Sequence, residues 1–296
     1  MRYRFLSEHA GEYRPIKKAC EILRISKSGY YEFLGRRKSN RQIEREALEG
    51  FVKDIFEEHK GRYGSRRISR QLASMGIRAS DKRVLKVLNE LGLKAKGTTR
   101  RYRRHRAVEP GDSRVNLIDR AFDVDGPNLL WVGDITYVPT RKGFLYLATV
   151  MDAWSRKVVG WSMSASATER LVVDALEQAV GRENPPDHGL VFHDDQGCQY
   201  TSRAFQRALD SHGITQSVSR PGCPYDNAVA ESFFKTLKRE LIKDGAYEDR
   251  EEAKQEIFKY VELYYNTVRQ HSKLGYVSPT EYERENEAMP LTNCPV

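Results

Sequence analysis

The sequence has few cysteines and no long apolar segment. Its four cysteines are scattered and form no CxxC pair, which argues against a zinc site or a disulfide framework and fits a reducing cytoplasm. No apolar run approaches the roughly 18–20 residues that span a bilayer, and the first residues contain no apolar stretch typical of a signal peptide. We therefore expect a cytoplasmic protein that has no membrane partner.

The two parts of the sequence carry net charges of opposite sign. Residues 1–116 contain 30 Lys and Arg against 14 Asp and Glu, a net charge of +16, whereas residues 117–296 contain 20 against 27, a net charge of −7. The two values add to the +9 of the whole chain. This asymmetry indicates a polyanion-binding module joined to a different domain. Solvated surface charge is the alternative, but so large a bias favours nucleic acid.

Helical periodicity dominates the first hundred residues. Residues 14–34 predict two short helices around a tight turn, with Ser26 as the N-cap of the second. A longer helix is expected at about 40–59. Its apolar stripe is predicted to consist of Ile43, Ala47, Phe51 and Ile55, which are four residues apart.

Residues 64–96 predict two further helices that are separated by a short turn, with Ser80 as the cap of the second. The outward positions of that second helix carry Lys82, Arg83 and Lys86. A helix, a turn and a basic second helix is the layout of a helix-turn-helix DNA reader, although basic helical hairpins also arise for packing reasons alone. These three residues are therefore candidate DNA contacts.

A basic segment follows at residues 94–116, with eight Lys and Arg against two acids and no apolar period. This composition indicates a linker. Its Arg101, Arg103 and Arg104 are candidate phosphate contacts, whose release of counterions would make binding salt-sensitive. A merely soluble tether is the alternative, but it would not need the run RRYRRHR.

From about residue 127 the sequence alternates β-branched and aromatic segments with helical ones. The predicted order is three strands, helix, strand, helix, strand, helix, helix, which indicates an α/β domain with a mixed sheet and helices on both faces. The next-to-last helix is expected to be capped by Asp226 or Asn227 and to end at Gly245.

Acidic residues in or beside apolar elements are informative, because a buried unpaired charge is costly. Asp134 lies within the first strand, Asp194 or Asp195 lies at the end of the fourth, and Glu231 lies in the first turns of a helix. Two charges about 4 Å apart repel by roughly 4 kcal/mol at an effective dielectric near 20. If three such carboxylates converge, they need protonation or a cation. Each acid alone has a simpler interpretation, as a hydrogen-bonded core group or a solvated residue.

Mg²⁺ or Mn²⁺ would match such a cluster, because both prefer hard oxygen ligands. Two ions roughly 4 Å apart would activate a water or hydroxyl and stabilise the leaving oxygen in phosphoryl transfer. Lys235 and Lys238 stand four and seven residues after Glu231, so all three can share one helix face. We expect the two lysines to hold DNA phosphates nearby.

The segments WVGDITYV, HDDQGCQY and DNAVAESFFKTLKREL resemble the three acidic blocks of retroviral-integrase-like transposases. The likeness is greatest to the second-frame (OrfB) product of the insertion-sequence group called IS-three, whose signature is D…D, 35 residues, E and a basic residue seven positions later. Here 35 residues separate Asp195 from Glu231, and Lys238 stands at the basic position. The helix-turn-helix at about 43–97 and the tail at 264–283 extend the resemblance over nearly the whole chain.

This resemblance implies that Asp134, Asp195 and Glu231 are a metal-binding catalytic triad (DDE) and that Lys238 contacts transposon-end DNA. The implied fold is a ribonuclease-H-like integrase core, with a mixed five-stranded sheet, preceded by an all-α helix-turn-helix region. The implied reaction cuts strands at the ends of the element and transfers the freed 3′-hydroxyl into another phosphodiester. The resemblance further implies a bacterial, nucleoid-associated protein that works as a homo-oligomer on double-stranded DNA, with an OrfA-type partner as a further possibility.

The predicted domains are a helical segment at 1–38, a helix-turn-helix domain at 39–97, a basic linker at 98–120, and an integrase core with its C-terminal helix and tail at 121–288.

Two features depart from the family pattern. Asp194 stands where the family usually has Ser, and the chain begins at the OrfB-like Met, whereas the full transposase is usually an OrfA–OrfB fusion. Because successive strand residues point to opposite faces, Asp194 and Asp195 cannot both enter one site, and the 35-residue spacing selects Asp195. The alternatives to a transposase are a catalytically idle DNA-binding partner or regulator, and a ribonuclease-H-type nuclease, which gives no reason for the helix-turn-helix.

Overall fold

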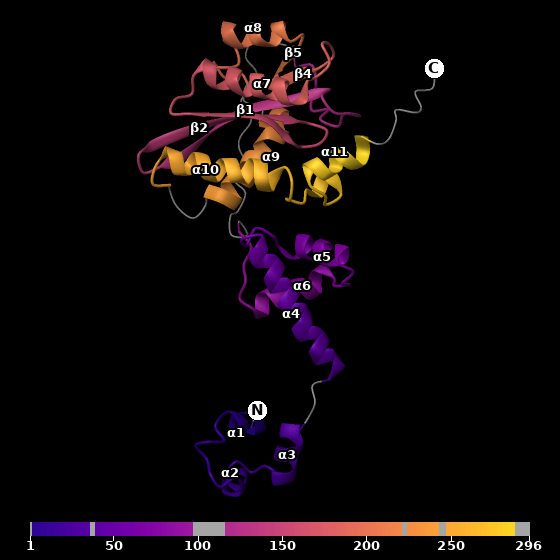
Figure 1. Cartoon of the computed structure of the whole chain (residues 1–296), viewed down its shortest axis with the longest axis vertical. Helices are drawn as coiled ribbons and strands as arrows, with labels where there is room; N and C mark the ends of the chain where they lie inside the picture. Colours follow the sequence, from indigo (N-terminus) through magenta and orange to yellow (C-terminus); the bar gives the residue numbers. More distant parts are fainter. Residues whose placement is uncertain (1, 36–38, 97–115, 221–223, 243–246, 288–296) are drawn as a thin grey trace, which may run out of the picture.

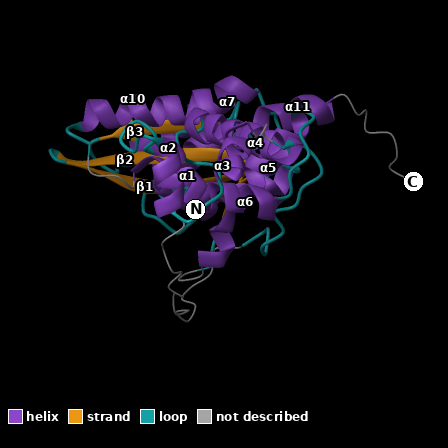
Figure 2. Ribbon diagram, turned by 90° about the horizontal axis from the view of Figure 1, so that it is seen from below, coloured by secondary structure: helices purple, strands orange, loops and turns teal. Residues whose placement is uncertain are grey.

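The computed structural model describes residues 2–35, 39–96, 116–220, 224–242 and 247–287. They form a small N-terminal helical unit, a second helical unit and an α/β core, which follow one another along the long axis of the molecule (Figure 1). Viewed along that axis, the helices α1 to α6 project onto the core rather than beside it (Figure 2). No helix in these ranges is long and apolar enough to cross a membrane.

The N-terminal unit has the two short helices expected at 14–34, preceded by one more. Ser26 caps the last of them, since its hydroxyl accepts a hydrogen bond from the Gly29 N–H at 3.3 Å. The helices are α1 (Arg2–Glu8), α2 (Ile16–Ile22) and α3 (Lys27–Gly35). They enclose a small core of four buried side chains, Leu6, Ala19, Cys20 and Tyr30.

The second unit contains the expected helix-turn-helix. Its helices are α4 (Asn40–Glu58), α5 (Ser65–Ser74) and α6 (Asp81–Glu90). Ser80 caps α6 as predicted, with its hydroxyl accepting from the Arg83 N–H at 3.3 Å. The apolar core of the unit is built from one face of each helix.

The stripe predicted for α4 is wrong in its register. Ile43, Ala47 and Phe51 are exposed, and the residues that α4 buries are Leu48, Val52 and Ile55. The first turns of α4 extend beyond α5 and α6 (Figure 1), so no partner buries Ile43 there. A four-residue repeat also drifts around a helix of 3.6 residues per turn, which places Phe51 beside the buried face rather than on it.

The core contains the expected mixed five-stranded sheet, with strand order β3-β2-β1-β4-β5. The strands are β1 (Leu130–Thr140), β2 (Gly143–Asp152), β3 (Val158–Ser164), β4 (Val191–Asp194) and β5 (Thr215–Val218). The first three pair antiparallel through tight turns, whereas β4 and β5 run parallel to β1. The helical crossovers before β4 and β5 explain the parallel pairing.

Helices cover both faces of this sheet, as predicted (Figure 1). One face carries α7 (Glu169–Glu183) and α8 (Arg203–Ser211). The other carries a 3₁₀ turn (Pro224–Asn227), α9 (Ala228–Leu237), a π-helical continuation (Lys238–Ile242), α10 (Arg250–Tyr260) and a second π segment (Val261–Tyr265). A 3₁₀ turn (Ser272–Leu274) and α11 (Pro279–Glu287) end the described chain. The end predicted for α9 at Gly245 lies outside the described residues.

The second helical unit contacts the C-terminal part of the core. The Tyr63 hydroxyl accepts a hydrogen bond from the Gln270 N–H at 2.9 Å, and Arg67 Nε donates to the Gln270 carbonyl at 3.1 Å. The guanidinium of Arg62 lies 4.3 Å from the centre of the Tyr264 ring. Because these contacts join residues 200 positions apart, they fix the unit against the core.

A buried ion pair lies behind this contact. Glu240, which is 1% exposed, accepts hydrogen bonds from Arg269 Nη2 at 2.7 Å and Nε at 2.9 Å and from the Tyr260 hydroxyl at 2.9 Å. Arg67 Nη1 lies 3.8 Å from the same carboxylate. Burial alone would raise the pKa of Glu240, but the hydrogen bonds and charge of Arg269 outweigh it, so the pKa lies below its usual value.

Candidate active site

Asp134 lies in the middle of β1, between β2 and β4, and is half-buried. Its Oδ1 accepts a hydrogen bond from the Ile135 N–H at 2.7 Å. Burial raises the pKa of Asp134 to about 7, and the negative charges of Asp195 and Glu231 add to the rise. The Ile135 hydrogen bond and the charge of Lys238 oppose it. The structure thus places Asp195, Glu231 and Lys238 within electrostatic reach of Asp134.

Gly133 allows this part of β1 to pack closely against its neighbours. A Cβ at this position would collide with the ring of Phe192 and touch the ring of Tyr200. The phenol of Tyr200 is fully buried, and burial together with Asp134, Asp195 and Asp194 raises its pKa well above 10.0. A neutral phenol therefore forms the wall beside the acids.

The adjacent acids Asp194 and Asp195 separate at the end of β4. Asp194 is the last residue of the strand and 0% exposed, and its Oδ2 accepts a hydrogen bond from Gln216 Nε2 at 2.9 Å. Asp195 keeps access to solvent, and its Oδ1 accepts from the Gly197 N–H at 3.1 Å. The surrounding protein atoms still raise the pKa of Asp195. Of the two, Asp195 is the one whose negative charge raises the pKa of Asp134.

Glu231 lies in the first turn of α9 and is engaged by the helix itself. Its Oε2 accepts a hydrogen bond from Lys235 Nζ at 2.7 Å. Lys238 follows Lys235 by three residues, and its Nζ lies 5.0 Å from the centre of the Tyr137 ring. Burial lowers the pKa of Lys238, and the charge of Asp134 partly restores it. Glu231 and Lys238 thus lie near the strand that carries Asp134.

The acids are neighbours but do not form a closed ligand set. Within the described part of the chain, no three His, Cys, Asp or Glu side chains are close enough together to hold a metal ion as they stand. In this arrangement the Glu231 carboxylate is paired with Lys235 on its own helix, at 2.7 Å.

Asn227, at the start of α9, was expected to be a helix cap and has another role. Its side chain accepts no hydrogen bond from the first turn of α9. Its Nδ2 instead donates to the carbonyl oxygen of Gly133 at 3.0 Å. The sequence signal of an Asn before a helix fits either role, so sequence reasoning missed this link between α9 and β1.

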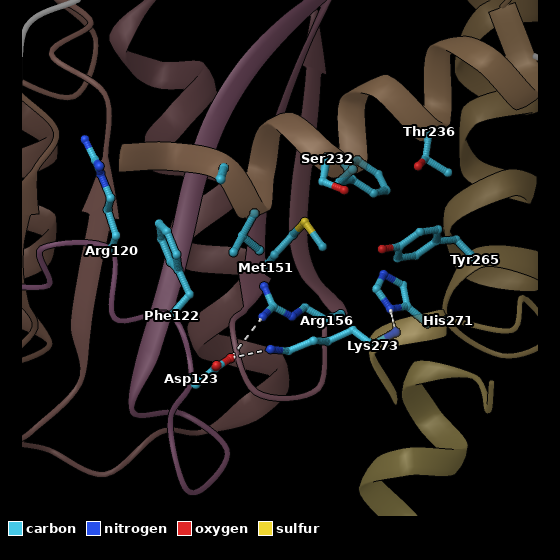
Figure 3. A pocket seen from close by; sticks show the side chains of 13 residues that line it. Arg120, Phe122, Asp123, Met151, Arg156, Ser232, Thr236, Tyr265, His271 and Lys273 are labelled. Carbon is cyan, nitrogen blue, oxygen red and sulfur yellow. Dashed lines mark hydrogen bonds and ion pairs between the residues drawn. The ribbon is translucent and has the colours of Figure 1, made fainter. Parts of the chain in front are cut away.

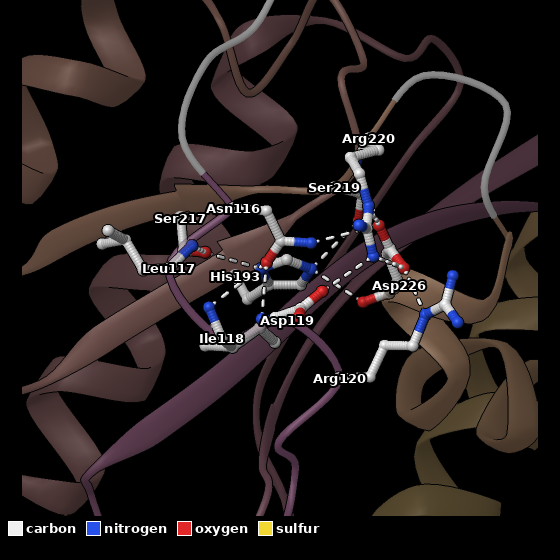
Figure 4. Close-up of polar contacts among 10 residues, drawn as sticks. All are labelled: Asn116, Leu117, Ile118, Asp119, Arg120, His193, Ser217, Ser219, Arg220 and Asp226. Atoms are coloured by element: carbon white, nitrogen blue, oxygen red, sulfur yellow. Dashed lines mark hydrogen bonds and ion pairs between the residues drawn. The ribbon is translucent and has the colours of Figure 1, made fainter. Parts of the chain in front are cut away.

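Asp226 is also not the cap of α9. Its carboxylate is fully buried and accepts hydrogen bonds from Arg120 Nε at 2.8 Å, Arg220 Nε at 2.7 Å and Asn116 Nδ2 at 3.1 Å (Figure 4). Its backbone carbonyl lies 2.8 Å from Nε2 of the buried His193. These bonds join the segment that enters the core to the start of α9. Sequence reasoning missed them because the partners are about a hundred residues apart.

The predicted DNA contacts lie elsewhere. Lys82, Arg83 and Lys86 are exposed on α6, in a unit separate from the acidic site (Figure 1). Lys86 Nζ lies 3.9 Å from Glu90 on the same helix. The other candidates, Arg101, Arg103 and Arg104, lie outside the described residues.

Comparison with known proteins adds a family to this geometry. Residues 124–224 and 212–279 match models described as an integrase core domain, and residues 42–102 match an HTH-like domain. The transposase for insertion sequence element IS904 of Lactococcus lactis subsp. lactis (strain IL1403) is 51% identical over 251 residues, which are 85% of this chain and 99% of that protein. Transposase InsF for insertion sequence IS3A of Escherichia coli (strain K12) is 40% identical over 294 residues, 97% of this chain and 100% of that protein.

The chain belongs to the IS3 family of transposases. The predicted resemblance is therefore confirmed, and so is the predicted fold class. The two integrase-core matches of this transposase include Asp134, Asp195 and Glu231, and the HTH-like match includes α5 and α6. Among solved structures, the simian T-cell lymphotropic virus intasome in complex with PP2A regulatory subunit B56 gamma is 18% identical, with a TM-score of 0.46 over 82% of this chain and 78% of that one.

Proposed function

We propose that this transposase cuts DNA at the ends of an insertion sequence and joins the freed 3′-hydroxyl to another phosphodiester, through Asp134, Asp195 and Glu231. The observation that supports this role is the pKa of Asp134, which burial and the charges of the other two acids raise to about 7. A site that raises a carboxyl pKa so far disfavours its own negative charge, which is typical of a site that is completed by cations.

The chemistry of the donor set fits Mg²⁺ or Mn²⁺, because it consists of hard carboxylate oxygens. Asp134, Asp195 and Glu231 would hold the metal, in our proposal as two ions. When bound, the ions supply activation of the attacking oxygen and neutralise charge on the leaving oxygen. To hold the metal, Asp134 must be ionised and Glu231 must separate from Lys235, whose ammonium then becomes available for a DNA phosphate beside that of Lys238.

DNA recognition is assigned to the basic parts of the chain. In the proposed domain division, residues 39–97 read double-stranded DNA, with Lys82, Arg83 and Lys86 as contacts, and residues 98–120 carry Arg101, Arg103 and Arg104 to the backbone. The substrates would be the inverted-repeat ends and a target duplex. We further propose a homo-oligomer on DNA, with an OrfA-type partner, in the bacterial cytoplasm and associated with the nucleoid.

The test is metal-dependent nicking or joining of inverted-repeat ends by the full chain. We expect Asp195→Asn and Glu231→Gln to abolish the activity with Mg²⁺ and with Mn²⁺ while DNA binding persists. Glu256→Gln is the control, since Glu256 is an acid on α10 that also pairs with a lysine of its own helix, Lys259, at 3.0 Å. If both triad variants keep their activity, the assignment fails.

One observation supports a second candidate, a catalytically idle DNA-binding regulator of a longer OrfA–OrfB fusion. Glu231 is bound to Lys235, and no closed ligand set exists among the described residues. This candidate requires end-specific, salt-sensitive DNA binding without strand chemistry under either metal. Lys235→Gln, which frees Glu231 from the ion pair, tests this candidate. Strand cleavage by the variant with Mg²⁺ or Mn²⁺ would exclude an idle protein, and no cleavage with either metal would support one.

A further inference from the structure

A cavity of about 340 Å³ lies beside α9. Glu231, Lys235 and Lys238 are not among the residues that line it. Its walls come from residues 120–123, the end of β2 and the turn that follows it, α9, Tyr265 and the tail around residues 271–273 (Figure 3). The same helix thus borders the acidic site and the cavity.

Hydrogen-bond donors dominate the polar lining. Ser232 and Thr236 contribute hydroxyls from α9, and Tyr265 contributes a phenol. His271 is a neutral donor, because burial and nearby arginines lower its pKa to about 4. Its Nδ1 accepts from the Lys273 N–H at 3.3 Å, so its Nε2 carries the proton. These groups can all donate to an anion.

The charged groups of the lining also favour an anion. Arg156 and Lys273 line the cavity, and Arg120 at its edge is already bonded to Asp226. Asp123 is the single carboxylate among the lining residues that the structure describes. It stands at the mouth, 79% exposed along its side chain, and is 2.6 Å from Lys273 Nζ. The cavity itself therefore has a surplus of positive charge.

Arg156 is the feature that needs a ligand. It is 8% exposed, and its Nε has no hydrogen-bond partner in the described part of the molecule. Its nearest acid is Asp123, at 3.9 Å from Nη2. A buried guanidinium without good partners is costly, and a planar fork of donors is suited to phosphate oxygens. An anion that enters deeper than Asp123 reaches would supply the missing partner.

We propose that this cavity binds a phosphate of the DNA backbone, with Arg156 and Lys273 as charged donors and the hydroxyls of Ser232 and Tyr265 beside them. The assignment to DNA rests on the proposed function. It follows from the place of the cavity on α9, where a strand held at Glu231 needs only to cross one helix. Asp123 then acts as a competing carboxylate that the phosphate displaces from the mouth.

The first experiment uses inorganic phosphate as the probe and the full chain without DNA. Phosphate should raise the Tm of the protein relative to chloride at equal ionic strength. In Arg156→Gln the phosphate concentration for the half-maximal rise should increase by about tenfold or more, since a charge-assisted hydrogen bond is lost. Lys273→Gln, at an exposed position, should shift it in the same direction. Arg207→Gln on α8 is the charge-matched control.

A variant of opposite effect makes the test sharper. Asp123→Asn should lower the half-maximal phosphate concentration, because it removes the competitor. Asp125→Asn changes the net charge equally, two residues away and outside the cavity lining, and should have no such effect. If wild type and Arg156→Gln respond equally to phosphate, or if Asp123→Asn behaves like Asp125→Asn, the proposal is overturned.

The second experiment decides whether the phosphate belongs to DNA. For a duplex that contains an inverted-repeat end, Arg156→Gln should reduce the slope of log affinity against log salt by about 1, as expected for one lost phosphate contact. An unchanged slope and affinity, together with a weakened response to inorganic phosphate, would overturn the DNA assignment in favour of a free anion. Neither experiment measures strand cleavage. Failure of the phosphate site can therefore be distinguished from failure of the proposed catalytic function.

Discussion

Asn227 donates a hydrogen bond from its side-chain amide to the backbone carbonyl of Gly133, with 3.0 Å between Nδ2 and the oxygen. Gly133 directly precedes Asp134, and Asn227 directly precedes the helix that carries Glu231. One buried contact thus sets the spacing between two of the three proposed catalytic acids.

Removing this contact should impair catalysis more than DNA binding. Asn227→Ala leaves the Gly133 carbonyl buried without its partner, which costs about 1–3 kcal/mol of stability, and it removes the hydrogen bond that ties the start of α9 to β1. We expect kcat for strand cleavage to fall while the Kd for end DNA stays near that of wild type. Gln255→Ala, at an exposed position on α10, is the control. Equal losses in binding and cleavage would point to general unfolding instead.

Separate substitutions of the adjacent residues Asp194 and Asp195 should distinguish their roles. Asp194 is buried against Gln216, whereas Asp195 interacts with Asp134. We therefore expect Asp194→Ser to retain cleavage activity, with a lower Tm because the Gln216 amide loses a charged acceptor. Asp195→Asn should lose cleavage with an almost unchanged Tm. Abolished cleavage in a folded Asp194→Ser protein would mean that Asp194 is the catalytic residue.

The close approach at Gly133 predicts a stability loss on adding one methyl group. In Gly133→Ala the new Cβ would collide with the ring of buried Phe192, and such overpacking typically costs about 1–3 kcal/mol. Gly181→Ala is the matched control, because nothing lies within 4 Å of its added Cβ and Ala favours a helix by about 1 kcal/mol over Gly. Urea unfolding should move the two variants in opposite directions, and equal midpoints would contradict the packing argument.

Acid should destabilise the protein partly through His271. Burial, followed by the charges of Arg269, Arg156 and Arg67, lowers its pKa from 6.5 to about 4, against a weaker opposing effect of Glu240. Between these values the unfolded chain binds more protons than the folded one, so stability is complete above pH 6.5 and declines as the pH falls towards 4.

His271→Gln should reduce this decline, measured as the change in urea midpoint between pH 7 and pH 4.5. Part of the decline should remain, because burial also lowers the pKa of His193 to about 4. Exposed His188→Gln serves as the control. An unchanged decline in His271→Gln would show that the imidazole is not buried as described.

Periodicity and spacing predicted the elements and the three acids because both are local properties of the chain. The order of strands and helices along the chain and the caps Ser26 and Ser80 follow from neighbouring residues. What could not be foreseen depends on partners distant in sequence. Asn227 and Asp226 read as helix caps because their partners, Gly133 and Arg120, lie about a hundred residues away.

Burial produced the other errors and omissions. The stripe on α4 was assigned from a four-residue repeat, but which of Phe51 and Val52 is covered depends on where α5 and α6 end. Arg156 stands in a turn, where sequence alone suggests a solvated side chain. Only the fold shows that the turn is covered by the C-terminal tail.

The ion pair of Glu240 and Arg269 has a consequence for how members of this family can be recombined. Arg67 of the second helical unit approaches that pair and also binds the Gln270 carbonyl. A chimera that receives this unit from a relative without a basic residue at this position would leave a backbone oxygen unsatisfied next to a buried charge. The second helical unit and the core are therefore not independent modules. We expect a working chimera to take Arg67 and its partners Glu240 and Gln270 from the same parent.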